Sequence, residues 1–477
     1  MLWSALRVFV WIGGGYELLT TKVDPDLWGH VRFGLDILRS HQLTSTDPYS
    51  FTSDLSWINH EWLSELTFGG AYAVMGTDGL IIVRLLATIA TFLTIALAAR
   101  RAPQNWSGIA GCLVVLAIAP IVTTVRPQLW TLLFLAVLCR ILTAAPRWRY
   151  WLPLVFVLWV NMHGGWIVGF GVLTVWSLIE AFTPSAERPA NWLVLGIPVA
   201  CTVATLCNPY GWHLWEFLAR TVRLSRPDIV EWQPIWYKPN VTVPLWIAAV
   251  SWVALALRYA ERRLPQAVGV VAMLAFASMR VIRLLPLFIV ASVILLIAQI
   301  RKAPTTERQR LPEGRTIVDM VFATVGVLFV ASPLSVGCIQ MEGPWLPDVA
   351  AASAISAAHP RGHLVSWFNW GEYAIWHFGP ALKVSADGRR ETVYTDAVLS
   401  QQRAVAYGDL KALSALEETS PEYAWLPQIR GGLAKSWFRA HGYRIDIDTP
   451  LSFVAVRNDL PTVPPVAVAS AGCFPAP

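Results

Sequence analysis

The sequence has few charged residues and no cysteine arrangement suited to a metal. Only 14% of its 477 residues are charged, whereas 55% are hydrophobic, and the mean hydropathy is +0.49. Such a composition is too apolar for a soluble protein of this length. The six cysteines show neither CxxC nor Cys/His metal spacing, so no structural zinc motif is expected.

Signatures of nucleotide and nucleic-acid binding are also missing. Neither GxxxxGK nor a GxGxxG after a strand occurs. The net charge of +6 and the pI near 9.0 come from short basic clusters between apolar runs, not from a basic arm or an amphipathic face. We therefore expect no nucleic-acid partner.

What the sequence does contain is a series of apolar runs long enough to cross a bilayer. A transmembrane helix needs roughly 17 to 25 such residues. The candidate spans are 2–20, 78–99, 106–123, 127–143, 151–161, 165–182, 191–207, 241–257, 266–279, 284–300 and 316–334. We therefore expect a polytopic α-helical membrane protein with about eleven transmembrane helices, of which the short run 151–161 is either a span or a half-span. No inverted repeat accompanies the spans.

The basic clusters fall on alternate connections between these spans. They are Arg100 and Arg101; Arg147 and Arg149; Arg188; Arg258, Arg262 and Arg263; and Arg301, Lys302, Arg308, Arg310 and Arg315. By the positive-inside rule their side is cytoplasmic. This predicts a multi-pass protein of the bacterial inner membrane with a cytoplasmic N-terminus, a transmembrane domain 1–334 with external loops 21–77 and 208–240, and an external soluble domain 335–477. The first apolar run lacks a small-residue cleavage site, so we expect a retained helix.

The first external loop concentrates acidic residues. Between residues 22 and 78 there are eight acids and three bases. Asp24 and Asp26 flank a proline just beyond the first span, where an extended backbone would hold a base at the bilayer surface. His60 and Glu61, at the start of a helix, are further catalytic candidates. The alternatives are solvation of a helix end for the aspartates and a favourable helix dipole for Glu61.

Polar groups recur at the external ends of later spans. Arg126, Arg280 and Arg283 break the positive-inside rule there and need an anionic partner, either a lipid phosphate or diphosphate or an ion pair with the loop acids. The two glycines after His163 are typical of a broken helix that lines a cavity, although a packed, hydrogen-bonded histidine is the alternative. The substrate-cavity candidates are His30, Asn161, His163, Asn208, Tyr210, Glu231 and Glu372.

The C-terminal region has the turns and short strand-like runs of a small α/β or α+β domain. The runs 363–368 and 451–456 are the clearest strands. Cys338 and Cys473 are the external cysteines, which we expect to pair if the compartment is oxidising. The alternative is that they stay free, because residues 460–477 are rich in Pro, Ala and Val and are expected to be loose.

Several of these motifs together resemble a known superfamily. They are DPDLWGH, TDPYSFT, HEWLSE, RPQ, NMHGGW, NPYG, NWGEY and ADGR, in chain order. With the long external first loop, the many spans and the external C-terminal domain, they are similar to the GT-C superfamily of membrane glycosyltransferases and to a bacterial group of GT-C-like proteins.

The resemblance implies a sugar transferase that uses a polyprenyl-phosphate or diphosphate donor among membrane lipids, on the outer face. It implies a first-loop aspartate near the acceptor hydroxyl, which is Asp24 or Asp26 here. Some members use a divalent cation, for which Asp24, Asp26, His30 and Glu61 are candidate ligands. The second acidic motif of some members is missing, and His60 with Glu61 stands in its place. A polysaccharide polymerase or ligase and a non-enzymatic lipid or glycan transporter are the alternatives, and the oligomeric state is open.

Overall fold

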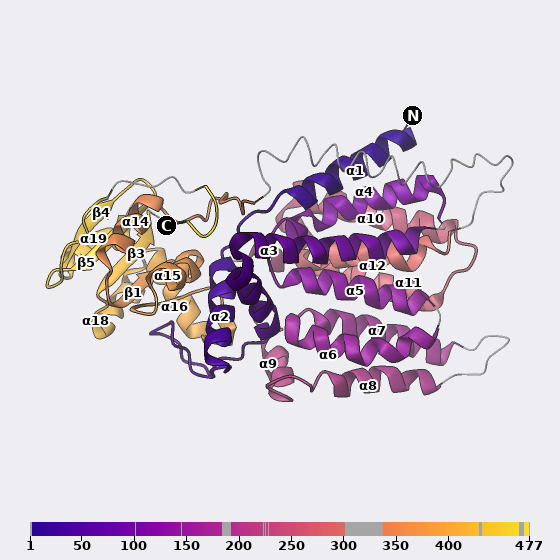
Figure 1. The fold of residues 1–477 in the computed structure, drawn as a ribbon, viewed down its shortest axis with the longest axis horizontal. Helices are drawn as coiled ribbons and strands as arrows, with labels where there is room; N and C mark the ends of the chain where they lie inside the picture. The colour runs from indigo at the N-terminus through magenta and orange to yellow at the C-terminus, as the bar shows by residue number, and fades with distance from the viewer. Residues whose placement is uncertain are drawn as a thin grey trace. The chain divides into compact units, whose positions relative to one another are not determined.

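The chain forms two compact units. The computed structural model describes residues 2–100, 102–144, 146–183, 192–222, 224, 226–227, 229–300, 337–428, 432–466 and 472–476 (Figure 1). Met1–Thr21 and Ile81–Val336 form the helical unit, and Lys22–Leu80 and Gly337–Pro477 form the sheet unit. The acidic first loop thus shares a unit with the C-terminal region.

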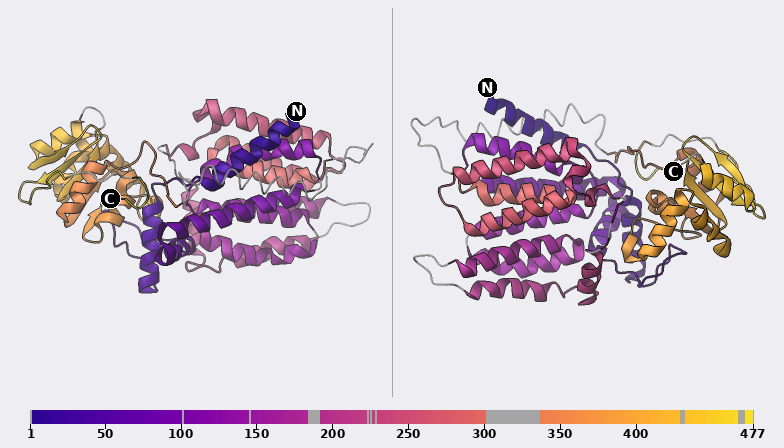
Figure 2. Two further views of the ribbon diagram at one scale, coloured as in Figure 1. Left: turned by 45° about the horizontal axis from the view of Figure 1, so that its top comes forward. Right: turned by 180° about the vertical axis from the view of Figure 1, so that it is seen from behind.

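The helical unit is built from apolar helices that run side by side (Figures 1 and 2). These are α1 (Leu2–Leu19), the later part of α3 (Trp62–Ala99), α4 (Gln104–Val122), α5 (Gln128–Thr143), α6 (Leu152–Met162), α7 (Trp166–Phe182), α8 (Gly196–Ala204), α10 (Pro239–Arg258), α11 (Pro265–Arg280) and α12 (Leu285–Ile297). Within the described residues each predicted span coincides with a helix, and the remaining span, 316–334, lies outside them. Of these helices α3, α4 and α10 are long and apolar enough to cross a membrane by length and composition, and the others are shorter. The predicted polytopic α-helical class is confirmed.

Helix α12 forms the core of this unit. It packs against α4, α5, α10 and α11, and every residue from Leu287 to Ile297 is buried. Other helices leave large apolar side chains exposed, as at Leu86, Leu93 and Leu116. A helix that is apolar all round suits the interior of a bundle, while exposed leucines on its neighbours suit contact with lipid.

A fully buried arginine joins the ends of two helices. Nη1 of Arg84 donates to the carbonyl oxygens of Glu17 at 2.8 Å and Val122 at 2.5 Å, and Nη2 donates to that of Leu18 at 2.6 Å. These carbonyls belong to the C-terminal turns of α1 and α4, where helices have no internal donors. Arg84 therefore fixes both ends against α3 and neutralises their dipoles.

Helix α3 agrees with the sequence-based prediction. A helix that starts near His60 and Glu61 and a separate span 78–99 were expected, and the element Trp62–Ala99 consists of two helices joined across a kink. The break is confined to Gly76, whose φ of 59° and ψ of −141° interrupt the helix for a single residue. Glycine alone tolerates such a backbone without strain.

The sheet unit contains a mixed five-stranded sheet in the order β2-β1-β3-β5-β4. Its strands are β1 (Gly362–Ser366), β2 (Leu382–Val384), β3 (Tyr423–Pro427), β4 (Tyr443–Asp448) and β5 (Ser452–Arg457), and its helices include α14 (Val349–Ala358), α15 (Gly371–Phe378), α16 (Asp396–Ala406), α17 (Leu410–Ser414), α18 (Leu416–Thr419) and α19 (Leu433–Ala440). Strand β1 pairs in parallel with β2 and β3, and β5 pairs antiparallel with β3 and β4. The expected α/β or α+β domain, including both predicted strands, is confirmed.

The first loop packs onto this sheet. Its amphipathic helix α2 (Leu27–Ser40) buries Leu27, Trp28 and Val31 completely. Beyond it, the chain pairs with the edge strand β2, since Val384 N–H donates to the Tyr49 carbonyl and Phe51 N–H donates to that of Val384. The loop therefore acts as an extension of the C-terminal domain.

The end of the chain is held in place, contrary to expectation. Cys338 and Cys473 form a disulfide, as predicted. Phe474 is buried, and the indole Nε1 of Trp28 donates to the carbonyl of Pro475 at 3.0 Å. The prediction of a loose tail is wrong for residues 472–476, because an aromatic side chain and a backbone carbonyl find partners on α2 and α15.

Candidate functional site

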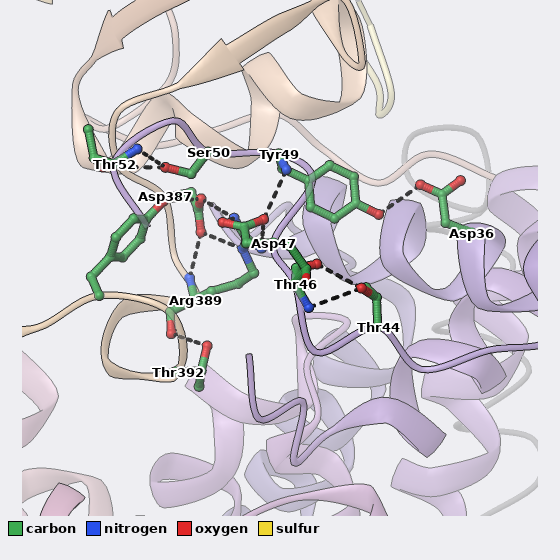
Figure 3. A network of polar contacts seen from close by, with 11 residues as sticks. Asp36, Thr44, Thr46, Asp47, Tyr49, Ser50, Thr52, Asp387, Arg389 and Thr392 are labelled. Carbon is green, nitrogen blue, oxygen red and sulfur yellow. Dashed lines mark hydrogen bonds and ion pairs between the residues drawn. The ribbon is translucent and has the colours of Figure 1, made fainter. Parts of the chain in front are cut away.

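A buried arginine links the first loop to the C-terminal region (Figure 3). The guanidinium of Arg389 donates to both carboxylate oxygens of Asp47, at 2.6 and 2.9 Å, and to both of Asp387, at 2.9 and 2.7 Å. Tyr394 donates a further hydrogen bond to Asp387 at 2.6 Å. Burial opposes ionisation, but the charge and hydrogen bonds of Arg389 lower the pKa of Asp387. We call this network the Arg389 clamp. It holds the segment around Arg389 against the first loop.

Asp24 and Asp26, the two base candidates, lie in different environments. Asp24 is buried, and its Oδ1 accepts the backbone N–H of Asp26 at 3.1 Å. Asp26 is only partly buried and occupies the N-cap position of α2 without a side-chain capping hydrogen bond. Asp24 therefore shapes the turn before α2, while the carboxylate of Asp26 is directed elsewhere.

That carboxylate faces Glu372 of α15. A Cβ on Gly388 would lie 2.2 Å from Oδ1 of Asp26 and 2.6 Å from Oε1 of Glu372, so both oxygens crowd around one point. A Cβ on Gly29 would lie 2.1 Å from Oε2 of Glu372, which has no hydrogen-bond partner in the described part of the chain. Only glycine at these two positions leaves room for the pair.

The pair has the electrostatics of an acid and a base. Glu372 is 3% exposed, and burial, with the charges of Asp26 and Asp387, raises its pKa well above the usual range. Two neighbouring carboxylates in a poorly solvated place do not both ionise readily, so the buried one retains the proton. Asp26 is the more exposed carboxylate of the pair.

A histidine and two further glutamates surround this pair. Nδ1 of His30 lies 3.4 Å from Oε1 of Glu65, whose Oε2 accepts from the amide of Asn59 at 2.5 Å. Burial disfavours the charged imidazole, but the hydrogen bond with Glu65 and the charges of Glu61, Glu65 and Asp26 outweigh it and raise the pKa of His30 to about 9. His30 is therefore an imidazolium at neutral pH. His60 lies beside Glu61, with Nε2 3.6 Å from Oε1.

The candidate metal ligands do not fit a metal site. Among the described residues no group of three or more His, Cys, Asp or Glu side chains is placed to hold a metal ion. Asp24, Asp26, His30 and Glu61 are all described and form no such group.

A second polar cluster occupies the helical unit. Glu231 in a short 3-10 turn (Val230–Trp232) accepts from Nη1 of Arg126 at 3.1 Å, and its other oxygen lies 3.8 Å from Nη1 of Arg283. Burial opposes ionisation, but the charges of Arg126 and Arg283 lower the pKa of Glu231. One carboxylate is thus shared by two arginines. The predicted anionic partner of these arginines is thus at least in part an acid of the second external loop.

His163 continues this second cluster. Its Nδ1 lies 2.6 Å from Oγ1 of Thr131 and accepts the backbone N–H of Gly165 at 3.0 Å, while its Nε2 lies 3.3 Å from Nη2 of Arg283. The indole of Trp159 donates to Thr131 at 2.9 Å. These bonds fix the imidazole plane against Arg283. His163 is therefore packed and hydrogen-bonded, as the alternative interpretation expected.

The remaining candidates take structural positions. Asn161 donates to the carbonyls of Val157 and Cys207, and Asn208 forms a turn by accepting the N–H of Tyr210 at 2.8 Å. Arg280 ends α11 with its guanidinium over the ring of Phe276. It is not part of the cluster formed by Arg126, Arg283, Glu231 and His163.

Sequence analysis overlooked the residues that position the first cluster. Arg389, Asp387, Glu65 and Asn59 were not among the candidates, although all four are polar and lie within or beside the motifs ADGR and HEWLSE. The sequence does predict that an arginine or acid in an otherwise buried segment needs a partner of opposite charge. It does not predict which residue that partner is, because Asp47 and Arg389 are 342 residues apart.

Comparison with known proteins gives a structural likeness only. No family model matches the chain, and no curated protein matches it. The chain is similar to the crystal structure of ArnT from Cupriavidus metallidurans bound to undecaprenyl phosphate, with 12% identity, a TM-score of 0.49, and 95% of this chain and 97% of that chain covered. The apo structure of the same ArnT gives 13% identity with the same TM-score and coverage.

At this identity and TM-score the likeness carries no argument about the family of this chain. It does not bear on the substrate or on the roles of particular residues, which are argued from the contacts above.

Proposed function

We propose that this protein transfers a sugar from a polyprenyl-phosphate or diphosphate donor to an acceptor hydroxyl at the outer face of the membrane. The observation that carries the proposal is the pair formed by Asp26 and Glu372, a partly exposed carboxylate beside a buried, protonated one. Such a pair at neutral pH supplies a base and a held proton. A purely structural role for this loop would not require two acidic side chains to lie together beside glycines.

Asp26 is the base in this proposal. Its carboxylate accepts the proton of the acceptor hydroxyl while the acceptor oxygen forms a bond to the anomeric carbon of the donor. The bond between that carbon and the phosphate oxygen breaks, and the phosphate leaves with the electron pair, so the anomeric configuration inverts. Before the transfer, the positive charge of the His30 imidazolium stabilises the carboxylate of Asp26 and the carboxylates near it.

Arg126 and Arg283 are the proposed donor-phosphate ligands. Both guanidinium groups belong to the polar cluster of the helical unit, and a guanidinium binds phosphate through two parallel hydrogen bonds. Charge that grows on the leaving phosphate would be stabilised by the same groups.

The proposal is tested with purified full-length protein and polyprenyl-phosphate sugars. Transfer to an extract of envelope glycans, followed by mass spectrometry, should show one added sugar and release of the free lipid phosphate. Arg283→Gln should weaken donor binding as well as turnover, because a phosphate contact of the ground state is lost. Arg280→Gln is the matched control, since Arg280 lies outside the cluster, and it should leave both unchanged.

The alternative classes predict different outcomes. A polymerase or ligase would add a preassembled oligosaccharide instead of a single sugar. A transporter would move the lipid-linked sugar across proteoliposomes without breaking its bond to phosphate. Release of lipid phosphate thus separates sugar transfer from transport, and the size of the added group separates a single-sugar transferase from a polymerase or ligase. Absence of the released lipid phosphate with every donor would overturn the proposal.

A further inference from the structure

The sheet unit contains a pocket that the proposed reaction does not use. It has a volume of 540 Å³ and lies between α2 and the loop that follows it. Its lining comprises Arg32, Phe33, Asp36, Ile37, Arg39, Ser40, Gln42, Leu43, Thr44, Pro48, Tyr49, Trp57, Asn59 and Pro380. Figure 3 shows part of its wall, with the ring of Tyr49 directed at Asp36.

Two arginines give this pocket a positive charge. Asp36 accepts from Nε of Arg32 at 2.8 Å, from Nη1 of Arg39 at 3.2 Å and from the hydroxyl of Tyr49 at 2.8 Å. One acid thus faces two guanidinium groups. Its oxygens are already occupied, so it repels an incoming anion less than an unbonded carboxylate would.

The unused donors belong mainly to Arg32. Its hydrogen bond to Asp36 comes from Nε, and in the part of the chain described here neither Nη1 nor Nη2 has an acceptor. The side chain of Arg32 is only 19% exposed, whereas that of Arg39 is 67% exposed. A half-enclosed guanidinium with two terminal nitrogens facing a cavity matches a carboxylate or phosphate group.

The remaining walls fit a ring with several hydroxyl groups. Ser40, Gln42 and Thr44 form a polar part of the lining, in which the Ser40 and Thr44 hydroxyls already bond backbone groups nearby, while Ile37, Leu43 and Pro48 offer apolar surface. The volume falls in the range of about 300 to 1,000 Å³ found for small-molecule sites, and it is far larger than a single inorganic anion needs. A ligand that combines polar edges, apolar faces and one negative charge fits these walls.

We propose that this pocket binds an anionic sugar, a ring that carries one carboxylate or phosphate group, as part of the acceptor. Arg32 and Arg39 bind the anionic group, and the polar wall binds the ring hydroxyls. Asn59 lines the pocket and donates to Glu65, the partner of His30, so the pocket adjoins the carboxylate cluster. The identification of the sugar as the acceptor rests on the proposed function, whereas the binding itself does not.

Binding is measured by calorimetry on the full-length protein, without any donor. The probes are glucuronate, glucose 1-phosphate, neutral glucose, and acetate and inorganic phosphate as anions without a ring. One of the two anionic sugars should bind saturably, about tenfold or more tightly than glucose and than its ring-free anion, because glucose lacks the charge-assisted hydrogen bond and the ring-free anion lacks the contacts of the ring. The stronger of the two sugars identifies the anionic group.

Two variants make the result decisive. Arg32→Gln should weaken binding of the anionic sugar about tenfold or more, while Arg39→Gln, at an exposed position that cannot disturb folding, should weaken it less. Arg439→Gln, an exposed arginine of α19 outside the pocket, is the control and should change nothing. Equal binding of glucose and both anionic sugars, or unchanged binding in both pocket variants, would overturn the proposal. Anionic-sugar binding in a protein that transfers no sugar would refute the proposed function and leave the pocket assignment standing.

Discussion

The charge on His30 makes the stability of the protein depend on alkaline pH. Its surroundings raise its pKa from an ordinary 6.5 to about 9. Since one pKa unit corresponds to about 1.4 kcal/mol, the folded state gains about 3 kcal/mol from the proton on His30. The folded pKa is the higher one, so this stabilisation is complete below about pH 6.5 and is lost as the pH rises through about 9.

The variant His30→Gln isolates this contribution, because glutamine does not titrate. Thermal unfolding of both proteins, followed by tryptophan fluorescence, should show the variant less stable near pH 6, with a difference that shrinks by about 3 kcal/mol near pH 10. His213→Gln, at an exposed site of the helical unit, is the control and should show no such change. A difference between wild type and His30→Gln that is the same at both pH values would refute the charged state of His30.

Three further predictions concern the clamp, the disulfide and the topology. Arg389→Met leaves two buried carboxylates without their partner and should cost roughly 3 to 5 kcal/mol in thermal unfolding, whereas the exposed Arg439→Met should cost almost nothing; equal stability of the two would contradict the clamp. Cys338 and its partner should react with a thiol reagent only after reduction, as located by mass spectrometry, and labelling beforehand would contradict the bridge. Reporter fusions should be cytoplasmic after Arg263 and external after Gly343, and the reverse pattern would place the carboxylate cluster on the wrong side of the membrane.

The helices could be predicted because a span is a local property. A run of about 20 apolar residues has no other stable environment than a bilayer or a bundle core, and helical geometry satisfies its backbone within the run itself. The runs at 127–143 and 266–279 became α5 and α11 almost residue for residue. The span 78–99 was also separated correctly from the helix before it, although the one residue of positive φ between them, Gly76, leaves no trace in hydrophobicity.

The site could be predicted only in part, because its geometry depends on contacts between distant residues. Asp26 and Glu372 each stood out as polar groups in unusual places, but nothing in either local sequence shows that they meet around Gly388. Asp47 accepts the N–H of Tyr49 at 2.9 Å, which is a local contact of the turn. The larger part of its role, the ion pair with Arg389, involves a residue at the far end of the chain.

The account depends most on the assignment of Asp26 as the base, which Asp26→Asn and Asp24→Asn test side by side. Asparagine keeps an oxygen that can accept the N–H bonded to Asp24, so Asp24→Asn should preserve the turn and most of the turnover. Asp26→Asn should fold and bind donor normally and lose turnover by roughly 100-fold or more, the usual effect of removing a general base. Full turnover in a folded Asp26→Asn protein would contradict the account, and loss of turnover in Asp24→Asn alone would assign the base to Asp24.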